Sequence, residues 1–212
     1  MMTNRSLFDE LIDIGDRIKA EYEEQENSWR ESPFRWLRNL SSRKKGTAAE
    51  RLVHEMLARS GFVIQQPKGS SDYDRLCYLE TNTEKYLRIE IKFSILWETG
   101  CYTFQQIRDQ EYDICFCLGI SPQSAHAWAV PKEVIWENAK WQHKGKKAQD
   151  TKWVSFSPSE PPEWIREYGG ELEKAIQVLR RLLNGQLCLD SIRDDHDSIV
   201  EKQNCGGTAP FL

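Results

Sequence analysis

Hydrophobic and polar residues alternate over nine positions from Leu87 to Ile95, in the stretch LRIEIKFSI. Alternation with a period of two predicts a β-strand, because successive side chains of a strand point to opposite faces. The apolar residues therefore share one face, and Glu90 and Lys92 share the other. What these two charged residues do depends on the elements around the strand.

Apolar positions elsewhere predict the remaining elements of a mixed α/β domain. The uniformly apolar run within YDICFCLGI is typical of a central strand covered on both faces. Helical spacing of apolar residues, with capping and breaking residues at the ends, marks the helices. We expect helices at residues 7–26, 34–40, 47–61, 103–111 and 170–184. We expect strands at residues 62–66, 76–80, 86–95, 112–120 and 126–130.

Composition predicts one soluble domain spanning residues 1–212. With 39% hydrophobic and 29% charged residues, the chain can bury one sizeable core. No apolar run approaches the roughly 20 residues that cross a bilayer, and the N-terminus lacks the apolar core of a secretion signal. The six cysteines match neither a disulfide scaffold nor a pair of CxxC zinc motifs. We therefore expect a cytoplasmic protein with no membrane partner and no structural zinc.

Charge is distributed unevenly, although the formal net charge is only −4. Residues 27–150 carry 19 basic and 15 acidic residues, whereas the segments on either side are acidic. We divide the domain into an N-terminal helical extension (1–45), a core (46–135), a basic loop with a C-terminal helix (136–189) and an acidic, mobile tail (190–212). The basic middle is compatible with a polyanionic ligand, but its small excess does not establish one.

Acidic residues occur around the alternating strand in an order that suits a divalent cation. Asp72 and Asp74 lie in GSSDYD, just before the strand at 76–80, and Glu90 lies on the next strand. If the two strands pair as a hairpin, Asp74 and Glu90 can converge. Two carboxylates suit Mg²⁺, which keeps several waters and takes further oxygens from phosphate groups. With Lys92 beside them to hold or help deprotonate a water molecule, these groups match the needs of phosphodiester hydrolysis.

The stretches GSSDYD and IEIK, in this order of elements, resemble the PD-(D/E)XK nuclease superfamily, which includes restriction endonucleases and many repair and recombination nucleases. The resemblance covers roughly residues 46–120, and residues 46–135 would form the catalytic core. It implies a restriction-endonuclease-like αβββαβ core, with a central mixed sheet flanked by helices. The proline of the family's name is missing here, because Ser71 or Tyr73 precedes the aspartate.

The resemblance also implies a role for individual residues. The first acid of the motif falls on Asp74, with Asp72 as the alternative, and the second acid and the lysine fall on Glu90 and Lys92. Many members carry a further glutamate on the preceding helix. The implied catalytic residues are Asp74, Glu90, Lys92 and Glu50. The implied ligands for Mg²⁺, for which Mn²⁺ could substitute, are Asp74, Glu90, Glu50 and the carbonyl of Ile91.

Each of these residues also has an ordinary structural explanation. Glu90 and Lys92 could form the polar side of a half-exposed strand, where a cross-strand pair contributes only about 0.2–1 kcal/mol. The aspartates of GSSDYD could simply form a turn. Glu50 could complete a capping box with Thr47 at the start of its helix. The wholly apolar companion face and the apolar neighbouring strand favour the site over the first of these explanations.

Several polar residues outside the motif could contact DNA. Gln, Arg and Lys side chains read base edges or bind phosphates, although a polar helix face and a solvated basic loop are the simpler interpretations. The candidates are Gln105, Gln106 and Arg108 on the helix expected at 103–111, and Lys144, Lys146 and Lys147 in the basic loop. His143 in the same loop is a candidate general base.

The resemblance implies a Mg²⁺-dependent DNA endonuclease that leaves 5′-phosphate and 3′-hydroxyl ends, similar to type II restriction endonucleases. Cutting double-stranded DNA generally requires two active sites, so we expect a homodimer, with the N-terminal helix as a candidate interface. The alternatives are a structure-selective or weakly specific nuclease of recombination, transposition or phage defence, and a DNA-binding subunit without catalysis. A protein-interaction module would instead have the Asp74 and Glu90 carboxylates far apart.

Overall fold

The computed structural model describes residues 7–69, 71–142 and 151–187 of the chain. The helices are α1 (Leu7–Trp29), α2 (Arg35–Arg38), α3 (Ser42–Arg59), α4 (Lys132–Asn138), α5 (Glu163–Arg166) and α6 (Leu172–Leu183). The strands are β1 (Val63–Gln65), β2 (Arg75–Leu79), β3 (Asn82–Ile95), β4 (Tyr102–Arg108), β5 (Ile114–Ile120), β6 (Ala125–Pro131), β7 (Lys140–Trp141), β8 (Thr151–Phe156) and β9 (Gly169–Gly170).

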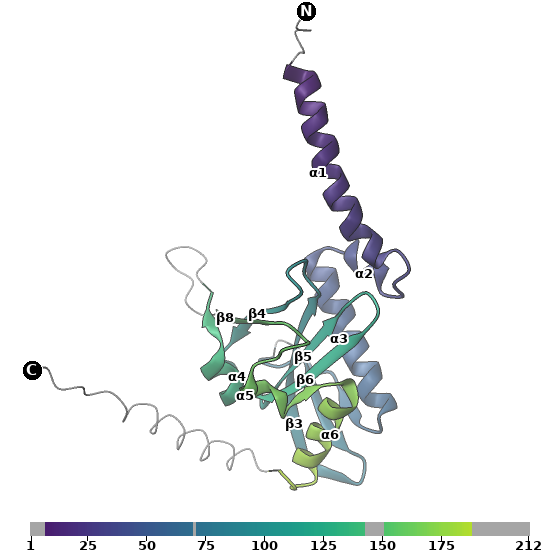
Figure 1. Cartoon of the computed structure of the whole chain (residues 1–212). Helices are drawn as coiled ribbons and strands as arrows, with labels where there is room; N and C mark the ends of the chain where they lie inside the picture. The colour runs from purple at the N-terminus through teal and green to yellow at the C-terminus, as the bar shows by residue number, and fades with distance from the viewer. Residues whose placement is uncertain (1–6, 70, 143–150, 188–212) are drawn as a thin grey trace, which may run out of the picture.

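Six strands form a mixed sheet in the order β1-β2-β3-β5-β6-β9. The β2–β3 hairpin is antiparallel, β3 pairs with β5 in parallel, and β5 pairs with β6 antiparallel. Every residue of β5 is buried, as its uniformly apolar sequence predicts for a strand covered on both faces. Helices α3 and α6 flank this sheet (Figure 1), so the predicted mixed α/β architecture is confirmed.

The prediction of a helix at residues 103–111 is wrong, because most of this segment forms strand β4. It pairs antiparallel with β8 in a second, three-stranded sheet of order β4-β8-β7. Tyr102, Phe104 and Ile107 are fully buried, so tertiary packing on the main sheet decides the conformation of this stretch. The αβββαβ order therefore has a strand where its second helix was expected.

An aromatic cluster joins the second sheet to the first. The ring centroids of Trp128 on β6 and Phe156 on β8 lie 4.9 Å apart, edge to face, and Phe104 contacts both rings. The Tyr102 ring lies so close to Gly119 that a Cβ there would come within 2.5 Å of it. The absence of a side chain on β5 at this point therefore allows β4 to pack onto the main sheet.

Helix α3 begins at Ser42, five residues before the predicted start, and takes in the segment expected as a basic loop. Thr47 lies inside the helix, where its Oγ1 donates a hydrogen bond of 3.3 Å to the carbonyl of Arg43. The explanation of Glu50 as part of a capping box with Thr47 is therefore wrong. Glu50 lies in the middle of the helix rather than in its first turn. The Glu50 side chain is left available for contacts beyond its own helix.

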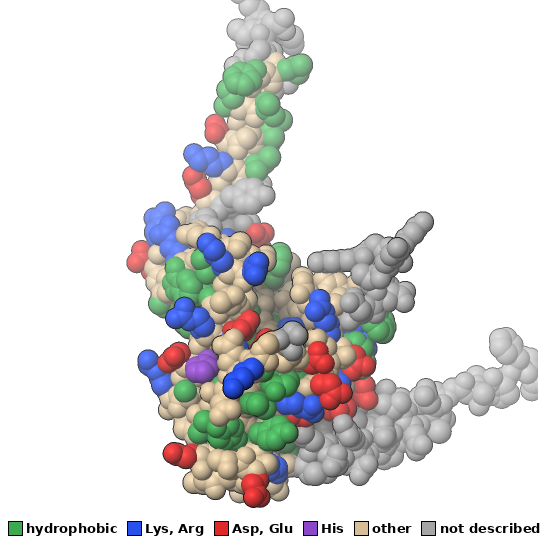
Figure 2. Space-filling view, turned by 180° about the vertical axis from the view of Figure 1, so that it is seen from behind, with side chains coloured by type: hydrophobic (Ala, Val, Ile, Leu, Met, Phe, Trp, Pro, Cys, Tyr) green, Lys and Arg blue, Asp and Glu red, His purple; other side chains and the backbone are tan. Residues whose placement is uncertain are grey.

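Helix α1 projects from the body of the protein (Figure 1) rather than packing along the core. Its large apolar residues from Leu7 to Ile18 remain exposed, between 83% at Leu7 and 43% at Ile14, whereas Trp29 at the end of the helix is buried in the core. Figure 2 shows this row of hydrophobic side chains along the projecting helix. The expectation of a homodimer through this helix stays a prediction. Within the described ranges, no helix combines the length and the apolar character needed to span a bilayer.

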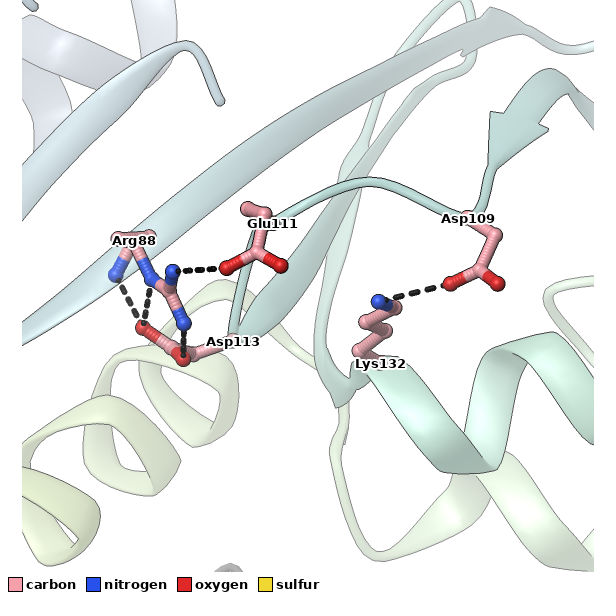
Figure 3. A network of polar contacts seen from close by, with 5 residues as sticks. All are labelled: Arg88, Asp109, Glu111, Asp113 and Lys132. Carbon is pink, nitrogen blue, oxygen red and sulfur yellow. Dashed lines mark hydrogen bonds and ion pairs between the residues drawn. The ribbon is translucent and has the colours of Figure 1, made fainter. Parts of the chain in front are cut away.

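A network of ion pairs fixes the segment that connects β4 to β5 (Figure 3). Arg88 of β3 makes two hydrogen bonds through its guanidinium to Asp113, at 2.8 and 3.1 Å, and pairs with Glu111 at 3.0 Å. Lys132, at the start of α4, pairs with Asp109 at 2.8 Å. The carboxylate of Asp113 raises the pKa of Arg88, mainly through these hydrogen bonds. The network holds Glu111 and Asp113 to β3 two residues before Glu90, and it holds Asp109 to α4.

Candidate active site

Asp74 is fixed to strand β3 by two hydrogen bonds, one from its side chain and one from its backbone. Its Oδ2 accepts from the backbone N–H of Ile91 at 2.7 Å, and its own N–H donates to the carbonyl of Ile89 at 2.9 Å. The hairpin register, with Arg75 opposite Ile89, brings the start of β2 beside the middle of β3. The carboxylate of Asp74 is therefore held next to the residue that separates Glu90 from Lys92.

Glu90 and Lys92 lie on one face of β3, as the alternation predicts. Their Oε1 and Nζ atoms are 2.5 Å apart, and the two side chains are 12% and 13% exposed. Such low exposure argues against the interpretation as an ordinary solvent-facing pair, because desolvating two charges is costly unless they have partners. The pair forms the centre of the candidate site.

Glu50 approaches the same site from helix α3. Its Oε2 lies 3.4 Å from Nη2 of Arg75, whose side chain is only 6% exposed. Arg75 also donates from Nη1 to the carbonyl of Asp74 at 2.5 Å. Arg75 thus links the helix that carries Glu50 to the turn that carries Asp74, a role that no pattern in the sequence indicates.

The pKa values of Glu90 and Glu50 are both raised. Burial raises the pKa of Glu90, the Asp74 carboxylate raises it further, and the Lys92 ammonium opposes both effects. Burial also raises the pKa of Glu50, again with a contribution from Asp74 and with Arg75 and Lys92 acting in the opposite direction. The Asp74 carboxylate therefore lies close enough to repel both Glu90 and Glu50, a cost that a bound cation would relieve.

This donor set fits a hard divalent cation of the Mg²⁺ type. Such ions take one or two carboxylates from the protein and complete their coordination with water and phosphate oxygens. Among the described residues, no three His, Cys, Asp or Glu side chains gather tightly enough to enclose a metal by themselves. An open pair of carboxylates, Asp74 and Glu90, is what an ion shared with a substrate phosphate requires, with Glu50 beside it.

A groove of about 850 Å³ opens beside these residues. Glu50, Ile91 and Lys92 line it from α3 and β3, and Gln105 and Gln106 line it from β4. Two basic residues, Arg38 of α2 and Lys45 of α3, also line the groove. Figure 2 shows Lys and Arg side chains gathered near the base of α1. The groove therefore brings Glu50 and Lys92 of the cluster together with further cations, which suits a polyanionic substrate.

Some predicted residues lie away from this cluster. Asp72 is exposed, and its Oδ1 accepts a hydrogen bond of 3.2 Å from Nε2 of Gln110. Arg108 is exposed at the end of β4 and does not line the groove. Lys144, Lys146, Lys147 and His143 lie outside the described residues. Of the two aspartates of GSSDYD, Asp74 is the one beside Glu90.

Comparisons with known proteins found similarity only among solved structures. No family model matches the sequence, and no curated protein matches it either. The fold is similar to the structure of a bacterial homing endonuclease, with a TM-score of 0.44 and 17% identity over 65% of this chain and 92% of that one. It is also similar to a Holliday junction resolvase from the archaeal hyperthermophile Archaeoglobus fulgidus, with a TM-score of 0.38 and 15% identity over 63% of this chain and 96% of that one.

Proposed function

We propose that this protein is a divalent-metal-dependent DNA endonuclease. The observation that carries the proposal is the convergence of Asp74, Glu90 and Lys92, with the Asp74 carboxylate bonded at 2.7 Å to the backbone between the other two. The combination of two carboxylates and one lysine at the edge of a groove that also holds cations is typical of phosphodiester hydrolysis. It is less easily explained by packing, because the cluster contains mutually repelling carboxylates.

Each residue has a distinct role in this proposal. Asp74 and Glu90 would hold Mg²⁺, the carbonyl of Ile91 would add a further oxygen, and Glu50 would serve the same ion or a second one through water. When bound, the ion polarises the scissile phosphate and offsets the negative charge that develops on it. Lys92 holds the attacking water by a hydrogen bond and stabilises the charged transition state. Arg75 acts as a positioning residue, because it holds Glu50 and the turn of Asp74 together.

The chemistry is an in-line displacement at phosphorus. The attacking water gives one proton to solvent and its oxygen forms a new bond to phosphorus, the bond from phosphorus to the 3′ oxygen breaks, and the 3′ oxygen takes up a proton from solvent. The products are a 5′-phosphate and a 3′-hydroxyl end. Neutral pH suits the reaction, since metal binding requires the carboxylates to be deprotonated.

We infer further that the substrate is double-stranded DNA, cut in the manner of type II restriction endonucleases. One groove supplies one active site, so two cuts in a duplex call for two copies of the chain. The exposed apolar face of α1 is the candidate contact between the copies.

Cleavage of supercoiled plasmid DNA with Mg²⁺ tests the proposal. We expect wild-type protein to nick and linearise the plasmid, and the Lys92→Ala and Glu90→Ala variants to be inactive. Lys85→Ala and Glu84→Ala are matched controls, because both residues are exposed on the outer end of the same strand. These two variants should cleave like wild type.

Two outcomes would overturn the proposal. One is a wild-type protein that neither nicks nor cuts plasmid, single-stranded or four-way-junction DNA with Mg²⁺ or Mn²⁺. The other is a Lys92→Ala or Glu90→Ala variant that cleaves as fast as wild type. Cutting restricted to junctions or ends, rather than at a short duplex sequence, would keep the nuclease and replace the restriction-type substrate.

A further inference from the structure

Strand β4 contains a β-bulge at the edge of the groove. Phe104 pairs with Val154 of β8, and Ile107 pairs with Lys152, so two residues of β4 occupy the space that faces one residue of β8. Phe104 and Ile107 are both fully buried, which anchors the strand on either side of the irregularity. Bulges of this kind redirect side chains and occur often next to functional sites.

The two residues inside the bulge, Gln105 and Gln106, are both exposed and both line the groove. In a regular strand, successive side chains point to opposite faces, so two neighbours would not share one cavity. The backbone of Gln106 takes a φ of 58°, the left-handed region that glycine tolerates and other residues rarely adopt. Position 106 therefore carries a glutamine side chain although its backbone conformation favours glycine.

A third glutamine, Gln142, directly follows strand β7 and forms hydrogen bonds with this pair. Oε1 of Gln142 accepts from the backbone N–H of Gln106, and its Nε2 donates to Oε1 of Gln105, each at 3.4 Å. Within the described part of the chain, the side-chain amide of Gln106 makes no hydrogen bond. The side-chain amides of Gln105 and Gln106 thus place hydrogen-bond donors and acceptors in the same groove as Lys92 and Glu50.

We propose that the bulge of Gln105 and Gln106 is the base-reading element of the groove, and that it selects for adenine. This inference rests on the proposed nuclease function and concerns its specificity. A glutamine amide can bond both N6 and N7 of adenine in the major groove, a pattern that no other base offers there. Strand β4 is at the edge of the three-stranded sheet β4-β8-β7, so no further strand of that sheet stands between the bulge and an approaching base edge.

The charges around the bulge suit this orientation of DNA. Arg38 and Lys45 line the groove from α2 and α3, where they can bind phosphates without reading sequence. Lys92 and Glu50 line the same cavity as these cations and the two bulge residues. One stretch of DNA can therefore meet phosphate contacts, the hydrolytic residues and the base-reading amides together.

The test is selection of bound sequences from a random duplex library, with Ca²⁺ in place of Mg²⁺ so that bound DNA stays intact. Wild-type protein should enrich a motif that contains adenine. In Gln105→Ala and in Gln106→Gly, the ratio of affinities for this motif and for a scrambled duplex should fall roughly 10-fold or more. Gln106→Gly should melt at or above the wild-type temperature, because glycine accepts the positive φ.

Gln65→Ala is the matched control, since Gln65 is exposed on β1 and does not line the groove. It should select the wild-type motif. A Gln105→Ala, Gln106→Gly double variant that enriches the same motif as wild type would overturn the inference, and so would a wild-type motif without adenine or no motif at all. Plasmid nicking with Mg²⁺ on the same preparations separates the nuclease proposal from the base-reading proposal. Nicking by a protein that selects no motif would overturn base reading and keep the nuclease function. A protein that does not nick would overturn both.

Discussion

The carboxylate of Asp74 accepts a hydrogen bond of 2.7 Å from the backbone N–H of Ile91, the residue between Glu90 and Lys92. This bond ties the loop before β2 to the strand that carries the other charged residues of the cluster. Asp74 therefore has two separable properties, a hydrogen-bond acceptor that supports the fold and a negative charge that can bind a cation.

Substitution of Asp74 should separate these two properties. Asp74→Asn keeps an acceptor for Ile91, so its free energy of unfolding should stay within about 1 kcal/mol of wild type. Asp74→Ala leaves a buried N–H without a partner and should lose about 1–3 kcal/mol. Both variants should lose plasmid cleavage roughly 100-fold or more, since neither keeps the charge. Urea unfolding and plasmid cleavage measure the two effects, and equal stability of Asp74→Asn and Asp74→Ala would contradict the structural role.

The Lys92 and Glu90 pair should show strong coupling in stability. Lys92→Met leaves the 12% exposed carboxylate of Glu90 without its cation, which should cost on the order of 3 kcal/mol. Adding Glu90→Gln removes the uncompensated charge, so the double variant should be more stable than Lys92→Met alone. A double-mutant cycle by urea unfolding measures this coupling. Simple additivity of the two single losses would show that the ion pair does not form in solution.

Divalent metal should stabilise the protein through the same cluster. A cation that binds only the folded state adds about 2.7 kcal/mol at 100 times its Kd. We expect Mg²⁺ or Ca²⁺ to raise the melting temperature of wild type, and the rise to disappear in Asp74→Asn. Asp72→Asn is the matched control, because Asp72 lies outside the cluster and bonds to Gln110. An equal metal-induced rise in Asp74→Asn and wild type would place the ion elsewhere.

Much of the main sheet was predictable because its strands carry clear patterns. The alternation of β3 predicts the shared face of Glu90 and Lys92, and the apolar run of β5 predicts a strand buried on both sides. Both are local signals, and the tertiary structure agrees with them. Asp74 could be placed near Glu90 because a short hairpin leaves few alternative registers.

Other features depend on contacts between distant residues, so the sequence could not predict them. Strand β4 takes its conformation from aromatic packing on Trp128 and Phe156, which local propensity does not reveal. The bulge follows from pairing with β8, a strand that lies more than 40 residues later. Arg75 joins Glu50 and Asp74 only because α3 packs beside the hairpin.

The half-buried histidine beside the second sheet, His126, should make stability depend on pH. Nδ1 of His126 lies 2.9 Å from the hydroxyl of Tyr102, and the ring stacks on Trp128. Burial lowers the pKa of His126 below its ordinary value of 6.5, so the unfolded chain binds a proton at a higher pH than the folded protein does. The contribution of His126 to stability is therefore complete above about pH 6.5 and is lost as the pH falls below that value.

Unfolding in urea between pH 8 and pH 5 measures this effect against His126→Gln, which cannot titrate. Wild type should lose stability relative to His126→Gln as the pH falls through about 6.5. His54→Gln, on α3, is the matched histidine control and should keep the wild-type loss. A constant difference between wild type and His126→Gln over this range would mean that the ring takes up its proton equally in both states, and that its burial beside Tyr102 does not persist in solution.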